Sequence, residues 1–282
     1  MPYARTLVPY ARTLRTCCAV LAGGLIWSGC SAEPEPAAKK ARPTTTAQQK
    51  PGPTAAPSPA ATPSPTGMDF TPDPGRAPKT AADGVRLART VAAGPEHFGP
   101  GFVRRAPYES DPAGWAVLDG DCLWQRQSPL PSGVLASLTR RSELPAQGGK
   151  GPLRVSAVVT VHRDVSGADW ELARTLEEAL RCPQQQLSRT EKITDLLSQG
   201  TVFGAGGNRY ADDALGELGK YYSDELGGPH HYYWDQARIG QVTVAVVSKG
   251  SKGRTKEELD EATSAAVSSM LIRLQQELEA AQ

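Results

Sequence analysis

Alternating apolar and polar residues mark the clearest strand of the chain, "LRVSAVVTVH", over residues 153–162. Every second residue from Leu153 to Val161 is apolar, and the residues between them include Arg154, Ser156 and Thr160. Successive side chains of a strand point to opposite faces of the sheet. The pattern therefore predicts a strand with one core face and one polar face, the latter open to solvent or to a cleft.

Two further segments carry strand patterns. "HHYYWDQARIGQVTVAVVSKG" predicts a β-hairpin that turns near Ile239 and Gly240. Its second arm, Val242 to Val247, is apolar on both faces, which is typical of a central strand. "WAVLDGDCLWQRQ", residues 115–127, predicts a strand and a turn around an Asp-Gly pair.

Apolar residues spaced three and four positions apart predict helices. Short helices are expected at 80–92 and at 132–144, the latter from "SGVLASLTRRSEL". A longer helix is expected from the N-cap Ser166 to Arg181. Its predicted buried face consists of Trp170, Ala173, Leu176 and Leu180.

The C-terminal segment predicts the longest helix. Thr255 and Glu258 form a capping-box pattern, and an apolar stripe follows from Leu259 to Leu278. The order is thus helix, strands, helix, hairpin and long helix, without regular alternation of strand and helix. This order predicts an α+β fold, a single domain over residues 81–282 with an antiparallel sheet flanked by helices.

The N-terminal segment resembles a bacterial lipoprotein signal. Three arginines without an acidic residue precede the apolar run "CCAVLAGGLIW", and Ser28 and Gly29 lead into Cys30. A run of this length is too short to span a bilayer but suits a secretion signal. Residues 1–29 are therefore expected to be a signal peptide. Cys30 is expected to carry palmitate-type acyl chains, and the alternatives are a plain secretory signal or an uncleaved anchor.

Residues 30–80 form a Pro/Ala/Thr-rich segment. It holds 12 of the 24 prolines of the chain, between Pro34 and Pro78. Such a composition buries too little apolar surface to offset the entropy of ordering, which predicts a disordered linker. The mixture of Ser, Thr and Pro is also compatible with O-glycosylation.

Cysteine parity agrees with this arrangement. Loss of residues 1–29 would leave Cys30, Cys122 and Cys182. Lipid on Cys30 leaves Cys122 and Cys182 as a pair, which predicts a disulfide in an oxidising compartment.

The motifs "DGDCLWQ", "VTVHRD" and "ALRCP", in this order after a leading helix, are similar to the extracellular sensor domains of PknH-like actinobacterial Ser/Thr kinases and their lipoprotein relatives. The resemblance implies an α+β domain with a cleft beside a twisted antiparallel sheet, which binds an envelope ligand and does not catalyse. This chain has one cysteine pair where the kinase members use two, and it shows no kinase domain or transmembrane helix. Signalling within one chain is therefore not expected.

Catalytic motifs give little support for an enzyme. The patterns G-x-S-x-G and H-E-x-x-H and the phosphate-binding P-loop do not occur. His230 and His231 are adjacent in a predicted strand and would point to opposite faces, so they are poorly placed to hold one metal ion. No cofactor or metal is expected. The alternative is a secreted hydrolase that uses His230 or His231 as base with Asp235 as its orienting partner.

Aromatic clustering is the stronger indication of a binding site. Five of the 17 aromatic residues lie within 14 positions: Tyr221, Tyr222, Tyr232, Tyr233 and Trp234. Tyr and Trp combine apolar area with a hydrogen-bonding group and are enriched in binding sites, although core packing is their commoner use. We predict ligand contacts from Tyr222, His231, Tyr232, Tyr233 and Trp234. Strand alternation allows at most one of the sets Tyr232/Trp234 and His231/Tyr233 to line a cleft.

Charge disfavours nucleic acid as a partner. Without residues 1–29 the chain carries 28 basic and 30 acidic side chains, because the removed segment contains three arginines and no acid. The sequence thus predicts a lipoprotein on the extracytoplasmic face of the cell membrane. Its domain would be a non-catalytic module for a small-molecule or cell-wall ligand.

Overall fold

The structure is a computed structural model that describes residues 70, 72–200 and 211–279. The predicted signal peptide, Cys30 and most of the predicted linker lie outside the described residues. Three α-helices and ten strands make up the described part, together with a short 3-10 helix at Pro95–His97. The helices are α1 (Ala81–Val91), α2 (Val165–Arg181) and α3 (Lys256–Leu278). The strands are β1 (Val103–Glu109), β2 (Trp115–Leu118), β3 (Trp124–Gln127), β4 (Val134–Leu144), β5 (Leu153–His162), β6 (Gln185–Ser188), β7 (Glu191–Gly200), β8 (Asp213–Ser223), β9 (Gly227–Ile239) and β10 (Val242–Lys249).

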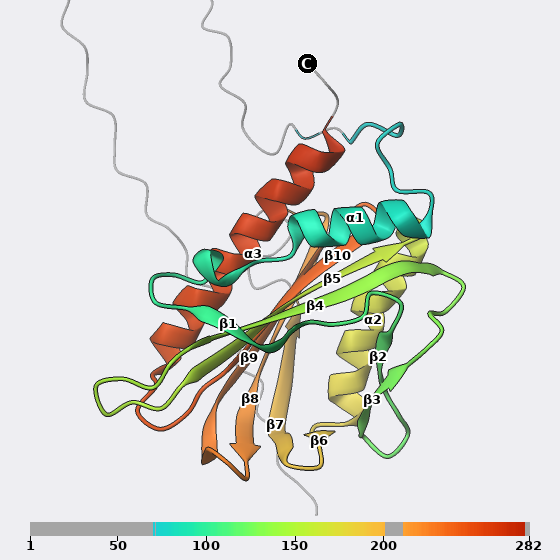
Figure 1. The fold of residues 1–282 in the computed structure, drawn as a ribbon. Helices are drawn as coiled ribbons and strands as arrows, with labels where there is room; N and C mark the ends of the chain where they lie inside the picture. The colour runs from blue at the N-terminus through green and yellow to red at the C-terminus, as the bar shows by residue number, and fades with distance from the viewer. Residues whose placement is uncertain (1–69, 71, 201–210, 280–282) are drawn as a thin grey trace, which may run out of the picture. The chain divides into compact units, whose positions relative to one another are not determined.

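Eight strands form one antiparallel sheet in the order β1-β4-β5-β10-β9-β8-β7-β6 (Figure 1). Strands β2 and β3 form a separate hairpin. The predicted α+β class with an antiparallel sheet is confirmed. The edge strands are β1, which contains Arg104, Arg105 and Pro107, and the four-residue β6.

Strands β5 and β10 lie at the centre of the sheet, as their patterns predict. They pair from Val242 opposite Val161 to Lys249 opposite Arg154. The alternating apolar residues of β5 are at most 1% exposed: Leu153, Val155, Ala157, Val159 and Val161. Helices α1 and α3 pack on this face of the sheet (Figure 1). The buried apolar surface between these helices and the sheet is the main core.

Helix α3 begins and packs as its sequence predicts. Thr255 is the N-cap, its hydroxyl accepts from the Glu258 amide, and the Glu258 carboxylate accepts from the Thr255 amide. The stripe from Leu259 to Leu278 is buried against the sheet and α1.

Helix α2 covers the opposite face and is rotated relative to the prediction. Its N-cap is Asp164, whose carboxylate accepts from the Gly167 amide, and not Ser166. Trp170 and Leu180 of the predicted buried face are 69% and 84% exposed. The residues that are buried instead are Ala168, Leu172, Glu178 and Ala179.

The physical reason is the polarity of the sheet face that α2 meets. Glu171 of α2 accepts hydrogen bonds from Thr243 at 2.7 Å and Gln236 at 3.3 Å, and lies 2.7 Å from His162 Nε2. A helix that packs on a polar surface must present its own polar side chains, because buried polar groups need partners. The apolar spacing of α2 alone therefore indicated the wrong face.

The helix predicted at 132–144 is wrong, because this segment is strand β4. Its apolar residues fit a helical spacing, but Val134 to Leu138 are buried between β1 and β5 on both faces. Pairing along β5, from Ala136 opposite Val161 to Leu144 opposite Leu153, overrides the local pattern. Strands β1, β6, β7 and β8 were not predicted either.

A disulfide joins Cys122 and Cys182, as cysteine parity predicts. It connects the turn between β2 and β3 to the C-cap of α2. The Trp124 indole N–H also donates to Gln185 Oε1 at 2.7 Å. These links place the β2–β3 hairpin beside the edge strand β6 (Figure 1).

No helix within the described ranges is long and apolar enough to cross a membrane.

Candidate functional site

A cavity of about 470 Å³ lies at one end of the sheet, where the β6–β7 and β8–β9 turns meet. Residues of these two turns and the strands beside them form its walls. Its lining residues are Gln186, Arg189, Thr190, Glu191, Lys192, Tyr222, Ser223, Asp224, Gly227 and Gly228. We refer to it as the turn pocket.

Strand pairing brings the two turns together. Glu191 lies opposite Ser223 and Lys192 opposite Tyr222 in the β7–β8 ladder, and the Asp224 amide donates to the Thr190 carbonyl at 3.0 Å. Gly228 has φ +150°, and a Cβ there would lie 2.7 Å from the Tyr221 carbonyl oxygen. Only glycine allows β9 to start this close to β8.

Tyr222 is the predicted ligand-binding residue that lines the turn pocket. Its ring is half-buried, and Lys192 Nζ lies 5.3 Å from the ring centroid. This is within the range of a cation–π interaction. The pocket therefore offers an aromatic surface with positive charge beside it.

A group of paired charges surrounds Glu191, which is one of the lining residues of the pocket. The Glu191 carboxylate accepts from Lys249 Nζ at 2.8 Å and from the Tyr221 hydroxyl at 2.7 Å, and Arg154 lies 3.8 Å away. Arg154 also pairs with Glu225 at 2.7 Å. We call Arg154, Glu191, Tyr221 and Lys249 the Glu191 network.

The charges of the network shift the pKa values of Glu191 and Lys249. Although burial would raise the pKa of Glu191, Lys249 and its other donors hold that pKa below the usual value. Burial lowers the pKa of Lys249, an effect that Glu191 opposes. The network was missed from the sequence. Its only sequence signal is a charged residue at one end of each of two apolar strands, Arg154 in β5 and Lys249 in β10.

The remaining predicted ligand residues lie elsewhere. Tyr232 and Tyr233 are 5% and 6% exposed and belong to the cores on opposite faces of the sheet. Trp234 packs on the same core as Tyr232, and His231 is exposed. The alternation expected for β9 is present, and it separates these side chains from one another.

The residues of the hydrolase alternative are not brought together. His230 and Asp235 are five residues apart on β9 and face opposite sides, and His230 Nε2 donates to the Leu226 carbonyl at 2.9 Å. His231 and Asp235 share a face but are separated by about 13 Å along the strand. This distance exceeds hydrogen-bond reach, so β9 offers no base with an orienting carboxylate.

Buried carboxyl groups lie on both faces of the sheet. Glu178 of α2 and Glu217 of β8 are 8% and 5% exposed. Burial raises the pKa of Glu178 to about 7 against the effect of Arg174, and burial together with Glu178 raises the pKa of Glu217 to about 8. On the other face, burial and nearby Asp260 raise the pKa of Asp235 to about 6. Within residues 72–200 and 211–279, no group of three or more potential ligands is arranged to hold a metal ion.

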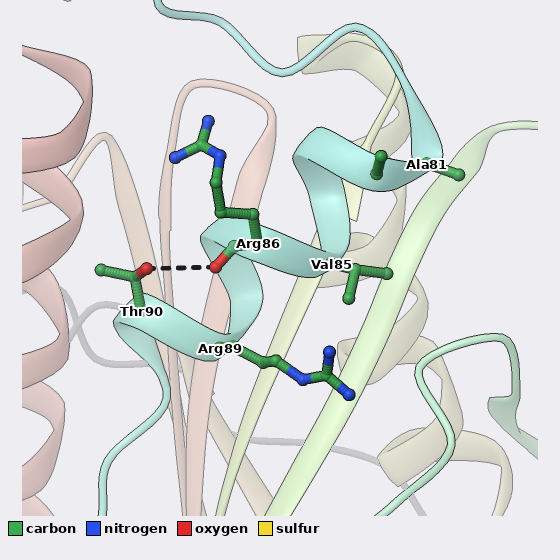
Figure 2. Close-up of a pocket in the computed structure, with 6 residues that line it drawn as sticks. Ala81, Val85, Arg86, Arg89 and Thr90 are labelled. Atoms are coloured by element: carbon green, nitrogen blue, oxygen red, sulfur yellow. Dashed lines mark hydrogen bonds between the residues drawn. The ribbon is translucent and has the colours of Figure 1, made fainter.

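A second cavity, of about 650 Å³, lies on α1 (Figure 2). The lining residues that the structure describes all come from this helix: Ala81, Ala82, Val85, Arg86, Arg89 and Thr90. Both arginines are engaged elsewhere, because Arg86 pairs with Glu277 and Arg89 pairs with Glu109. A surface built from one helix is a weaker candidate than the turn pocket.

Comparison with known proteins gives likeness in structure only. No protein-family model matches the chain, and no curated protein matches it. The extracellular domain of PknH from Mycobacterium tuberculosis is similar at a TM-score of 0.45 and 11% identity, over 66% of this chain and 95% of that one. A putative uncharacterized protein of Mycobacterium smegmatis (Rv0999 ortholog) is similar at a TM-score of 0.31 and 13% identity, over 65% and 96%.

These neighbours include the type of domain that the sequence motifs resemble. At such identities and TM-scores the likeness says nothing of ligand or activity. The functional argument therefore rests on this chain's own residues.

Proposed function

We propose that the chain is a membrane-anchored lipoprotein whose domain, residues 81–282, binds a ligand on the extracytoplasmic face without catalysing a reaction. The apolar run that ends at Cys30 and the Pro-rich segment after it support the anchor and the spacer. The Cys122–Cys182 disulfide supports an oxidising compartment, because such bonds are rare in the cytosol.

The turn pocket is the observation that carries the binding proposal. Its volume of about 470 Å³ falls within the usual range for small-ligand sites. The carboxylate of Glu191 already accepts hydrogen bonds from Lys249 and Tyr221. A ligand would therefore meet the Tyr222 ring and the side chains of Arg189 and Lys192.

The polar lining favours a ligand rich in hydrogen-bonding groups. Most of its members carry hydroxyl, amide or charged groups, and Tyr222 is its one aromatic side chain. A buried polar group that loses water must regain a partner, so an apolar ligand would be poorly matched. A hydroxyl-rich fragment such as a cell-wall saccharide fits the lining best.

The test begins with the protein purified from its own cell envelope. Native mass spectrometry, compared with the denatured mass, is expected to show an additional bound mass. Calorimetric titration with soluble cell-wall saccharide fragments is expected to give saturable binding. Tyr222→Ala should weaken it by about tenfold or more, because truncation of a central aromatic contact costs over 1 kcal/mol.

Trp170→Ala is the matched control, since Trp170 is an exposed aromatic residue outside the pocket. It should bind as the parent does. Equal loss in both variants, unchanged binding in Tyr222→Ala, or no binding by the parent would each contradict the proposal.

A further inference from the structure

Three arginines from three strands gather near the edge strand β1, on the sheet face that α2 packs against. They are Arg105 of β1, Arg141 of β4 and Arg126 of the β2–β3 hairpin. Arg126 lies near β4 because it donates to the Ser110 hydroxyl, which also accepts from the Thr139 amide of β4. In the β1–β4 ladder Val103 lies opposite Glu143, and the register shifts after Arg104. Strand alternation places Arg105 on the face of Val103 and Arg141 on the face of Glu143, so the two arginines share one face of the sheet. None of the three lines the turn pocket.

The hydrogen-bond partners of Arg126 and Arg141 are all neutral. Arg126 donates to the Ser110 hydroxyl and to the carbonyl oxygens of Asp111 and Gly114. Arg141 donates to the Pro107 carbonyl oxygen at 3.1 Å. Arg105 Nε is buried and has no hydrogen-bond partner in the described part of the chain.

Carboxylates near the cluster are already committed to other cations. Glu143 lies 3.8 Å from Arg154, and Glu191 binds Lys249. Within residues 72–200 and 211–279, no carboxylate forms an ion pair with Arg105, Arg126 or Arg141. The cluster is therefore a group of like charges without a counter-charge.

Arg141 is affected by the like charges around it. Burial, with repulsion from Arg105 and Arg126, lowers the pKa of Arg141. The charge of Arg105 also reaches Lys249: burial lowers the pKa of Lys249, and repulsion from Arg105 lowers it further. A half-buried guanidinium is stabilised by an anion, and its planar fork matches the oxygens of phosphate or carboxylate.

We propose that Arg105, Arg126 and Arg141 bind an oxyanion, the phosphate or carboxylate group of a ligand. Ser156, which lies opposite Arg141 in the β4–β5 ladder and is half-buried, can donate a further hydrogen bond. This site does not depend on the occupant of the turn pocket. The same chemistry is offered by a soluble phosphate compound and by the headgroup of an anionic lipid.

The experiment uses the purified full chain in low-salt, anion-poor buffer. Inorganic phosphate and pyrophosphate are titrated by calorimetry, and the melting temperature is followed with each, because a ligand of the folded state raises it. A second arm measures co-sedimentation with phosphatidylcholine vesicles with and without phosphatidylglycerol. The lipid arm compares variants only, so that any anchor contributes equally to all of them.

Arg105→Gln and Arg141→Gln should each weaken binding by about tenfold or more, the effect of losing one charge-assisted contact. Arg104→Gln is the matched control. Arg104 is the neighbour of Arg105 but rests on the Tyr108 ring, and its variant should bind as the parent does. Arginine-dependent binding of phosphate assigns a soluble ligand, and arginine-dependent binding confined to phosphatidylglycerol vesicles assigns a lipid.

A stability measurement separates this role from a structural one. In the absence of anion, Arg105→Gln should melt at or above the parent's temperature, because it removes repulsion and no hydrogen bond at Nε. A melting temperature well below the parent's would overturn the proposal. The same conclusion follows if neither phosphate, pyrophosphate nor anionic vesicles bind, or if Arg104→Gln binds as weakly as Arg141→Gln.

Discussion

Lys249 Nζ donates to the Glu191 carboxylate at 2.8 Å, and this bond joins the last residue of β10 to the first residue of β7. The two side chains are 18% and 20% exposed. β9 and β8 lie between these strands in the sheet. The bond therefore links a lining residue of the turn pocket to a central strand of the sheet.

Glu191→Gln is expected to lower the free energy of unfolding by about 1.5–3 kcal/mol, because it leaves Lys249 and Arg154 short of a counter-charge. Urea unfolding at pH 7 measures the change. Glu225→Gln is the control: its side chain is 67% exposed, so loss of its bond to Arg154 should cost less than about 1 kcal/mol. Equal effects of the two substitutions would refute the buried role of Glu191.

Glu217 predicts a pH dependence of stability. Its pKa is about 8 in the folded protein and is close to the ordinary 4.5 when unfolded. A raised carboxyl pKa stabilises the fold below the unfolded value, and this contribution is lost as the pH rises toward 8. The free energy of unfolding should therefore fall between about pH 5 and 8 more steeply in the parent than in Glu217→Gln.

Urea unfolding at several pH values measures this slope. At pH 8 the Glu217→Gln variant should be more stable than the parent. Glu177→Gln is the control, since Glu177 is an exposed neighbour of Glu178 on the same helix. A Glu217→Gln slope indistinguishable from the parent's would show that Glu217 does not titrate in this range.

Removal of the disulfide should destabilise the domain. The bond closes a loop with a sequence separation of 60, for which loop entropy gives a contribution of roughly 4 kcal/mol. The double variant Cys122→Ser/Cys182→Ser should unfold at correspondingly lower urea concentration. Thiol labelling of the native parent should leave Cys122 and Cys182 unlabelled. Label on both of these residues would disprove the bond in the isolated protein.

Lipid attachment is tested at Cys30. Metabolic labelling with palmitate should modify the parent and Cys17→Ala, but not Cys30→Ala. Acyl chains attached at Cys30 would anchor the parent in the membrane. Cys30→Ala lacks the attachment site and should therefore appear in the soluble fraction. Label retained in Cys30→Ala would place the modification elsewhere.

Sequence patterns correctly predicted the elements that pack against a uniformly apolar core. β5, β10 and α3 each meet an apolar core on their patterned face, so alternation and helical spacing were sufficient. For α2 the pattern predicted the helix but the wrong buried face, because the helix meets the polar side chains of His162, Gln236 and Thr243. It also failed for β4, whose helical spacing is overridden by pairing with β5.

The site was harder to predict for a related reason. Tyr222, which lines the candidate pocket, was among the predicted residues because aromatic residues cluster in the sequence. Glu191, Lys249 and Arg154 are separated by up to 95 positions, and only strand order brings them together. The three arginines of the proposed oxyanion site are likewise scattered along the chain, and nothing in their local sequence distinguishes them from solvent-exposed charges.

The two edges of the sheet have a consequence for self-association. β1 offers Pro107, which has no N–H to donate, beside two arginines, and β6 is only four residues long with the β2–β3 hairpin next to it. An exposed strand edge can pair with the edge of another molecule and start aggregation. Edges of this kind would keep neighbouring copies of the protein from joining their sheets into fibres.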